Sequence, residues 1–114
     1  MKKFTITIGT TFDKNGNVLN HKEAPKSAVQ NALIFCADLG CNERAFEGWT
    51  ILETFGGWFN GSQWVTEKGL QIVIYSDLDA RYFKHVAKYI GEQFDQDTAV
   101  LTVEDAPETH FLKC

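Results

Sequence analysis

The sequence has little of the residue types that mark specialised classes of protein. It contains three cysteines and two prolines in 114 residues, too few for a disulfide scaffold or a proline-rich disordered chain. No apolar run approaches the length of a membrane span. The alternating residues after the first three positions also differ from the continuous apolar core of a signal peptide. We therefore expect a cytoplasmic protein with reduced thiols and no membrane contact.

An excess of positive charge is also missing. The formal net charge is −4 and the isoelectric point is about 5.3. Proteins that bind nucleic acid directly need a cationic surface that displaces counterions from the phosphates. The carboxylates are scattered along the chain rather than grouped in runs, so the sequence does not indicate a mimic of DNA either. We expect no direct nucleic-acid partner.

The sequence shows no motif for a metal, a cofactor or a catalytic nucleophile. Cys36 and Cys41 are separated by four residues, a poor fit to zinc-knuckle spacing, and the three histidines are far from one another in sequence. The pair Gly56-Gly57 is not followed by the Gly-Lys-Ser/Thr of a phosphate loop. We expect no metal, no cofactor and no catalytic constellation.

Aromatic and apolar residues are plentiful by contrast. Nine Phe, three Trp and three Tyr accompany an apolar fraction of 44%. A chain of this length with this composition can bury a core without metals or disulfides. We expect one domain over residues 1–104 and a C-terminal tail over residues 105–114.

Periodicity along the chain predicts four strands and two helices. Period-two alternation indicates strands, and apolar spacings of three and four indicate helices. The expected strands cover residues 4–12, 49–55, 70–75 and 98–103. A first helix is expected from Pro25 to a stop at Gly40, and a second after a cap at Asp77 or Asp79. Asn60-Gly61 predicts a hairpin with a type I′ turn. The order β-α-β-β-α-β favours an α+β ferredoxin-like fold, a four-stranded antiparallel sheet with two helices on one face.

One face of this predicted sheet is unusually free of charge. The other face of the sheet is apolar and would lie under the helices. The face nearly free of charge points away from the helices and would carry Thr5, Thr7, Gln71, Val73, Tyr75, Val100 and Thr102. A fully solvated face normally carries Lys and Glu. We expect a second copy, the tail or a partner to cover it, the alternative being a tolerated Thr/Val surface.

Four aromatic residues gather in the predicted hairpin, around Gly56, Gly57 and Gly61: Phe55, Trp58, Phe59 and Trp64. Glycine lets a ligand approach the backbone, and aromatic faces stack on planar rings or anchor a protein partner. The alternative is a hairpin whose aromatic residues fold down over the helices. Alternate residues of a hairpin face opposite sides, so we do not expect all four to be buried together.

Two carboxylates flank this hairpin. Glu53 and Glu67 lie on adjacent predicted strands and could face each other, the minimum arrangement for acid–base chemistry. Since no nucleophile, histidine or metal is fixed near them in sequence, ordinary surface glutamates are the alternative.

Several segments resemble a group of short, uncharacterised bacterial and phage proteins. They are the run from Gly48 to Phe59, then Glu67, the strand Leu70–Tyr75, and the run from Tyr89 to Val103. The shared pattern is G-x-T-x-x-x-x-x-G-x-W, a Glu opening the next strand, and Phe-x-Gln-x-x-Val-Leu before the last strand. Ala99, placed before Val100-Leu101, departs from that pattern. The likeness covers about residues 45–104 and implies the ferredoxin-like fold, with no activity to carry over.

Taken together, the sequence favours a small non-catalytic binding protein of phage or mobile-element origin, located in the host cytoplasm if phage encoded. In its concrete form it inhibits a host defence complex by occlusion, in the manner of an anti-CRISPR protein. Three alternatives stay open: a sponge that stacks a small nucleotide on Trp58 or Trp64, a small enzyme with Glu53 or Glu67 as general base, and a structural homo-oligomer, a homodimer in the simplest case.

Overall fold

The computed structural model describes residues 1–38, 46, 48–106 and 108–114 of the chain. Along the chain the elements are β1 (Lys2–Gly9), α1 (Pro25–Asp38), β2 (Thr50–Phe59), β3 (Trp64–Ser76), α2 (Ala80–Gln93) and β4 (Val100–Asp105). The predicted β-α-β-β-α-β order is confirmed. The predicted helix stop at Gly40 and the thiol of Cys41 lie outside the described residues.

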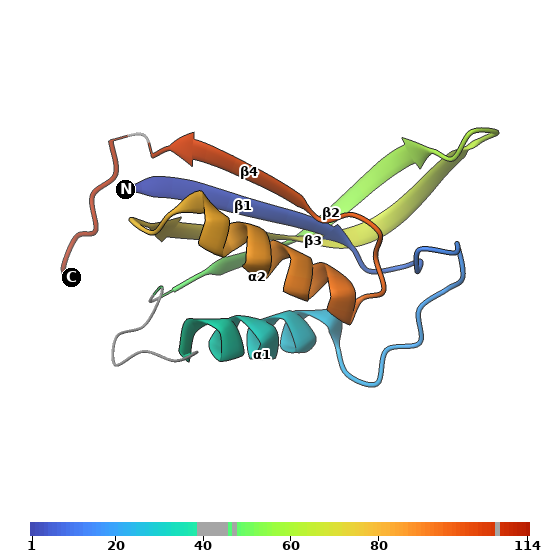
Figure 1. The fold of residues 1–114 in the computed structure, drawn as a ribbon, viewed down its shortest axis with the longest axis horizontal. Helices are drawn as coiled ribbons and strands as arrows, with labels where there is room; N and C mark the ends of the chain where they lie inside the picture. The colour runs from blue at the N-terminus through green and yellow to red at the C-terminus, as the bar shows by residue number, and fades with distance from the viewer. Residues whose placement is uncertain (39–45, 47, 107) are drawn as a thin grey trace.

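The four strands form one sheet in the order β2-β3-β1-β4, and every neighbouring pair is antiparallel. Both helices lie on the same side of the sheet, and the far ends of β2 and β3 bend away from them (Figure 1). The predicted ferredoxin-like α+β fold is therefore confirmed. The side of the sheet away from the helices, called the open face below, carries no helix in the described chain.

The core lies between the helices and the sheet. The side chains of Phe4, Ile6 and Ile8 from β1 and of Leu70, Ile72 and Ile74 from β3 are buried, as the alternation predicts. Phe4 stacks on Phe83 of α2 with ring centroids 3.9 Å apart. The whole predicted stripe of α2 is buried, namely Phe83, Val86, Ala87, Ile90 and Phe94. Val103 on the edge strand β4 is 37% exposed, because no further strand flanks it.

Helix α2 begins at a carboxylate cap. Asp79 has extended backbone angles, and its side chain accepts a hydrogen bond of 2.8 Å from the backbone N–H of Arg81. This bond is the main reason why the pKa of Asp79 lies below its usual value, and the Arg81 side chain lowers the pKa further. Of the two predicted caps, Asp79 is therefore confirmed.

The β2–β3 hairpin forms as predicted, but its turn differs. Phe59 pairs with Trp64, so the loop has the four residues 60–63 instead of two. Gly61 has φ +101°, whereas a type I′ turn would also need a positive φ at Asn60. The Asn60 side-chain oxygen instead accepts bonds from the N–H groups of Ser62 and Gln63, and this replaces the tighter turn.

The ends of two strands differ slightly from the predicted ones. Strand β1 ends at Gly9, three residues before the predicted end, and β4 extends one residue into the predicted tail. Cys36 is a buried free thiol whose pKa is raised by burial, and Cys114 is an exposed free thiol. Within the described residues, neither helix has the length and apolar character needed to cross a membrane.

Candidate functional site

The register of the strands fixes which side chains the open face presents. Directly paired residues of an antiparallel sheet point to the same side, so the face follows from the pairs Thr5 with Val73, Gly9 with Gly69, and Gly56 with Glu67. All the predicted open-face residues lie on it. It also carries, beyond that prediction, Lys3, Gly9, Thr50, Leu52, Thr54, Gly56, Trp58, Val65, Glu67, Gly69 and Glu104.

Gly9, Gly56 and Gly69 lack side chains on this face and leave a hollow where the hairpin bends away from the helices. The cavity has a volume of about 540 Å³, within the range of small-molecule sites. We call it the glycine pocket. It is lined by Thr7, Ile8, Gly9, Phe12, Asp13, Lys14, Thr54, Gly56, Gly57, Trp58, Glu67, Gly69, Gln96, Asp97, Thr98 and Val100.

Glu67 is the distinctive residue of the glycine pocket. Its Oε2 atom is closed to solvent and has no hydrogen-bond partner among the described residues. The carboxylate lies over Gly9, where a side chain would otherwise stand. A carboxylate oxygen removed from water without a partner is costly, and a nearby cation is what offsets that cost best. The arrangement therefore suits a ligand with a positive charge.

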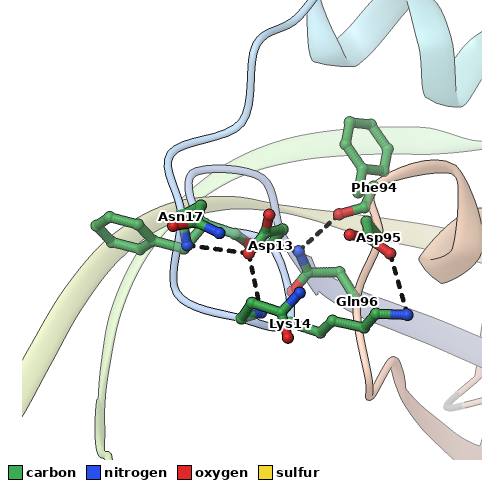
Figure 2. A network of polar contacts seen from close by, with 8 residues as sticks. Asp13, Lys14, Asn17, Phe94, Asp95 and Gln96 are labelled. Atoms are coloured by element: carbon green, nitrogen blue, oxygen red, sulfur yellow. Dashed lines mark hydrogen bonds and ion pairs between the residues drawn. The ribbon is translucent and has the colours of Figure 1, made fainter.

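The wall of the pocket opposite the hairpin is a pair of loops held together by polar contacts (Figure 2). The Gln96 side chain donates hydrogen bonds to the carbonyl oxygens of Phe12, at 2.6 Å, and Phe94, at 2.9 Å. The backbone N–H of Lys14 donates to the Asp95 carbonyl at 2.8 Å, and the Lys14 ammonium lies 3.4 Å from the Asp95 carboxylate. This wall therefore joins the loop after β1 to the loop after α2.

Each of these loops has a local reason for its shape. Asp13 accepts bonds from the backbone N–H groups of Asn15 and Asn17, at 2.8 and 2.9 Å, and this closes a tight turn. Asp95, which follows the C-terminal cap of α2, has φ +50°, a left-handed conformation that aspartate tolerates better than most residues. The turn and the helix end therefore meet in a defined geometry beside the pocket.

The charges of the pocket lining are mostly negative. Among its described residues, Glu67, Asp13 and Asp97 carry carboxylates, and Lys14 is the one cation. The Lys14 ammonium is already paired with Asp95. The field in the pocket therefore favours a cationic ligand over an anionic one.

The prediction that Glu53 and Glu67 face each other is wrong. Glu53 pairs with Leu70 while Glu67 pairs with Gly56, which places the two carboxylates on opposite faces of the hairpin. Glu53 lies on the helix side and contacts the Lys26 ammonium at 2.9 Å. That hydrogen bond is the main reason why the pKa of Glu53 is below its usual value. No acid–base pair is formed by these two residues.

The structure exposes all four hairpin aromatics but divides them between the two faces. Trp58 lines the glycine pocket on the open face and is 45% exposed. Phe55 lies on the helix side and borders a separate cavity of about 590 Å³ with Lys26 and Glu53. Phe59 and Trp64 contact each other at the hairpin tip, with ring centroids 5.3 Å apart, and are more than half exposed.

Tyr75 is remote from the other predicted site residues. It pairs with Lys3 at the opposite end of β3 from the hairpin tip. Its ring lies edge-on to Phe111 of the C-terminal tail, with centroids 6.2 Å apart. Tyr75 therefore contacts the tail instead of contributing to the glycine pocket.

Sequence reasoning missed Gly9, Gly69 and the loop contacts of Gln96. The signal for the glycines was present, since both interrupt alternating strands at positions of the open face. The signal for Gln96 was not, because its partner Phe12 is 84 residues away. In the described part of the chain, no group of three or more His, Cys, Asp or Glu residues is placed to hold a metal ion.

Comparison with known proteins finds likeness in structure alone. No protein-family model matches the chain, and the search of curated proteins finds no match. A phage SAM lyase in the apo state is similar, with a TM-score of 0.64 and 18% sequence identity over 90% of this chain and 78% of that one. The phage SAM lyase in complex with S-methyl-5'-thioadenosine has a TM-score of 0.62 and 16% identity, over 91% and 80% of the two chains.

CutA1 from Pyrococcus horikoshii is also similar, with a TM-score of 0.57 and 11% identity over 96% of this chain and 87% of that one. At these identities the likeness establishes a shared fold. It is consistent with the ferredoxin-like architecture described above, and it assigns no function to any residue of this chain.

Proposed function

We propose that this chain binds SAM, or a closely related adenosyl sulfonium compound, in the glycine pocket and cleaves it. The observation that carries the proposal is the solvent-shielded, unpartnered oxygen of Glu67 in a pocket with mostly negative charge. A sulfonium is a compact, permanent cation without hydrogen-bond donors. It therefore suits a carboxylate that needs a countercharge and is not reached by water.

The adenosine part of such a ligand would find an aromatic partner in the same pocket. Trp58 lies on the same face as Glu67 and lines the same cavity. Stacking of a base on an aromatic side chain contributes about 1–3 kcal/mol. The structural likeness to phage SAM lyase, one structure of which is a complex with S-methyl-5'-thioadenosine, supports this choice of ligand.

The proposed reaction needs no metal, oxidant or second substrate. The carboxylate of the methionine portion attacks its own γ carbon, and the bond between that carbon and sulfur breaks. Sulfur keeps the electron pair and becomes a neutral thioether, so the products are S-methyl-5'-thioadenosine and a four-carbon lactone. Glu67 holds the cationic substrate, and loss of the positive charge weakens the attraction to the product and favours its release.

Replacement of one carboxylate tests this function. Glu67→Gln removes the charge and keeps the shape, so the affinity for SAM should fall roughly ten- to hundredfold, because the attraction between two unit charges near a protein surface amounts to a few kcal/mol. The affinity for neutral S-methyl-5'-thioadenosine should change little. Isothermal titration calorimetry measures both, and chromatography with mass spectrometry follows the products.

Glu53→Gln is the matched control, because Glu53 lies on the same hairpin but faces away from the pocket. Equal affinity of the wild type and Glu67→Gln for SAM would contradict the proposal. Tight binding that leaves SAM intact would replace cleavage with sequestration, the function of a nucleotide sponge.

The hairpin tip favours a second candidate function, contact with a protein. Phe59 and Trp64 are exposed aromatic residues of the kind that anchor interfaces. We propose that this tip joins copies of the chain, and inhibition of a host defence complex stays a prediction for the same surface. Light scattering after size exclusion should give a mass above one chain for the wild type. A Phe59→Ser, Trp64→Ser double variant should give the monomer mass, and a monomeric wild type would contradict self-association.

A further inference from the structure

The position of the Glu67 carboxylate depends on the absence of a side chain at Gly9 of β1. A methyl group built on Gly9 would lie 2.5 Å from Oε1 of Glu67 and 2.8 Å from both its Oε2 and its carboxyl carbon. A Cβ atom in a protein essentially never lies within 3.0 Å of an atom to which it is not bonded. The Glu67 carboxylate therefore occupies the volume that any side chain at residue 9 would fill, and it rests directly on the β1 backbone.

The neighbouring glycines have different roles. A methyl group on Gly69 would meet the backbone carbonyl oxygen of Ile8 at 2.4 Å, so Gly69 is needed for the approach of two strands. A methyl group on Gly56 or Gly48 would meet nothing within 4 Å. Among the described glycines, Gly9 is the one whose added methyl would meet Glu67 first.

We infer that Gly9 is a positioning residue that holds the Glu67 carboxylate against β1, and that this placement lets the pocket distinguish a sulfonium cation from a neutral thioether. The inference rests on the proposed function for the identity of the cation. The shielding of Oε2 from water is the physical basis, since a carboxylate attracts a cation more strongly where water does not screen it.

Gly9→Ala should move the carboxylate without unfolding the protein. The atoms that the new methyl group would meet belong to the end of a flexible side chain, which can rotate toward solvent. In that position the carboxylate is hydrated, and its attraction for a bound cation is screened. Selection by charge is therefore lost while the strand and the rest of the pocket remain.

The experiment compares Gly9→Ala with wild type and with Gly48→Ala, a control outside the pocket. Calorimetry gives the ratio of the affinities for SAM and S-adenosylhomocysteine, the neutral thioether that keeps the ammonium and carboxylate of SAM. We expect this ratio to fall about tenfold in Gly9→Ala and to stay unchanged in Gly48→Ala. Carbon-13 NMR of the Glu67 side-chain carboxyl gives a readout that needs no ligand. In Gly9→Ala its signal should move toward those of exposed glutamates such as Glu108.

An unmoved carboxyl signal in a folded Gly9→Ala protein would overturn the positioning role. A moved signal with an unchanged affinity ratio would overturn the role in charge selection. If the wild type binds neither compound, the proposed function fails by itself, and the NMR comparison still decides whether Gly9 positions Glu67. Circular dichroism confirms that each variant is folded.

Discussion

Gly69→Ala is expected to lower the free energy of unfolding by about 3 kcal/mol, at the upper end of the range for overpacked sites. The added methyl group would stand 2.4 Å from the carbonyl oxygen of Ile8 and 2.9 Å from Oγ1 of Thr54. The first of these atoms belongs to the backbone of β1, which pairs with β3 along eight residues. Relief of the clash therefore requires the strands to separate locally.

Urea unfolding followed by circular dichroism measures this loss. Gly56→Ala is the control, because it adds the same methyl group to the same hairpin where nothing lies within 4 Å. Its stability should stay within about 0.5 kcal/mol of wild type. Equal stability of Gly69→Ala and wild type would mean that β1 and β3 are farther apart at this point than the structure places them.

Glu67→Leu is expected to raise the free energy of unfolding by about 1–3 kcal/mol, the usual cost of leaving a buried polar group without a partner. Leucine removes the unpartnered oxygen and adds apolar surface to the glycine pocket. The same change should abolish binding of SAM. A gain in stability together with a loss of binding is the signature of a residue retained for function.

Thermal and urea unfolding of Glu67→Leu, without ligand, give the measurement. Glu53→Leu is the control, since Glu53 is exposed and paired with Lys26, so no gain is expected from its removal. A Glu67→Leu protein less stable than wild type would show that the carboxylate has a partner that stabilises the fold.

Local pattern was enough to predict most of the fold. The alternation of Phe4, Ile6 and Ile8 predicts which side of β1 is buried. The spacing of the apolar residues in α2 does the same for that helix. These patterns are short in range and are set by the geometry of one strand or helix. The element order then restricts the topology to few choices, and the observed sheet is the expected one.

The candidate site was predicted only in part. The sequence predicts Glu67 and Trp58 as site residues, but the prediction that Glu53 faces Glu67 is wrong. A hairpin loop with an even number of residues puts odd-numbered residues of β2 on the same face as even-numbered residues of β3. Glu53 and Glu67 are both odd, so either a two-residue or a four-residue loop separates them. The sequence contained this information, and the arithmetic of the register recovers it.

The remainder of the site depends on contacts between distant segments. The Gln96 side chain meets the carbonyl of Phe12, and the Lys14 ammonium meets the Asp95 carboxylate. Neither contact has a local pattern in sequence. The closeness of Glu67 to Gly9 is of the same kind, because it depends on the β1–β3 register and on the path of one side chain.

The hydrogen bond from Gln96 to Phe12 joins a loop near the start of the chain to a loop near its end. It closes a span of 84 residues, so the pocket wall exists only after the first and last parts of the chain have come together. A fragment that ends before Gln96 contains every hairpin residue of the site yet lacks this wall of the glycine pocket. Occupancy is therefore coupled to cooperative folding of the entire domain, and a bound compound should delay amide hydrogen exchange in β1 and β4 as well as in the hairpin.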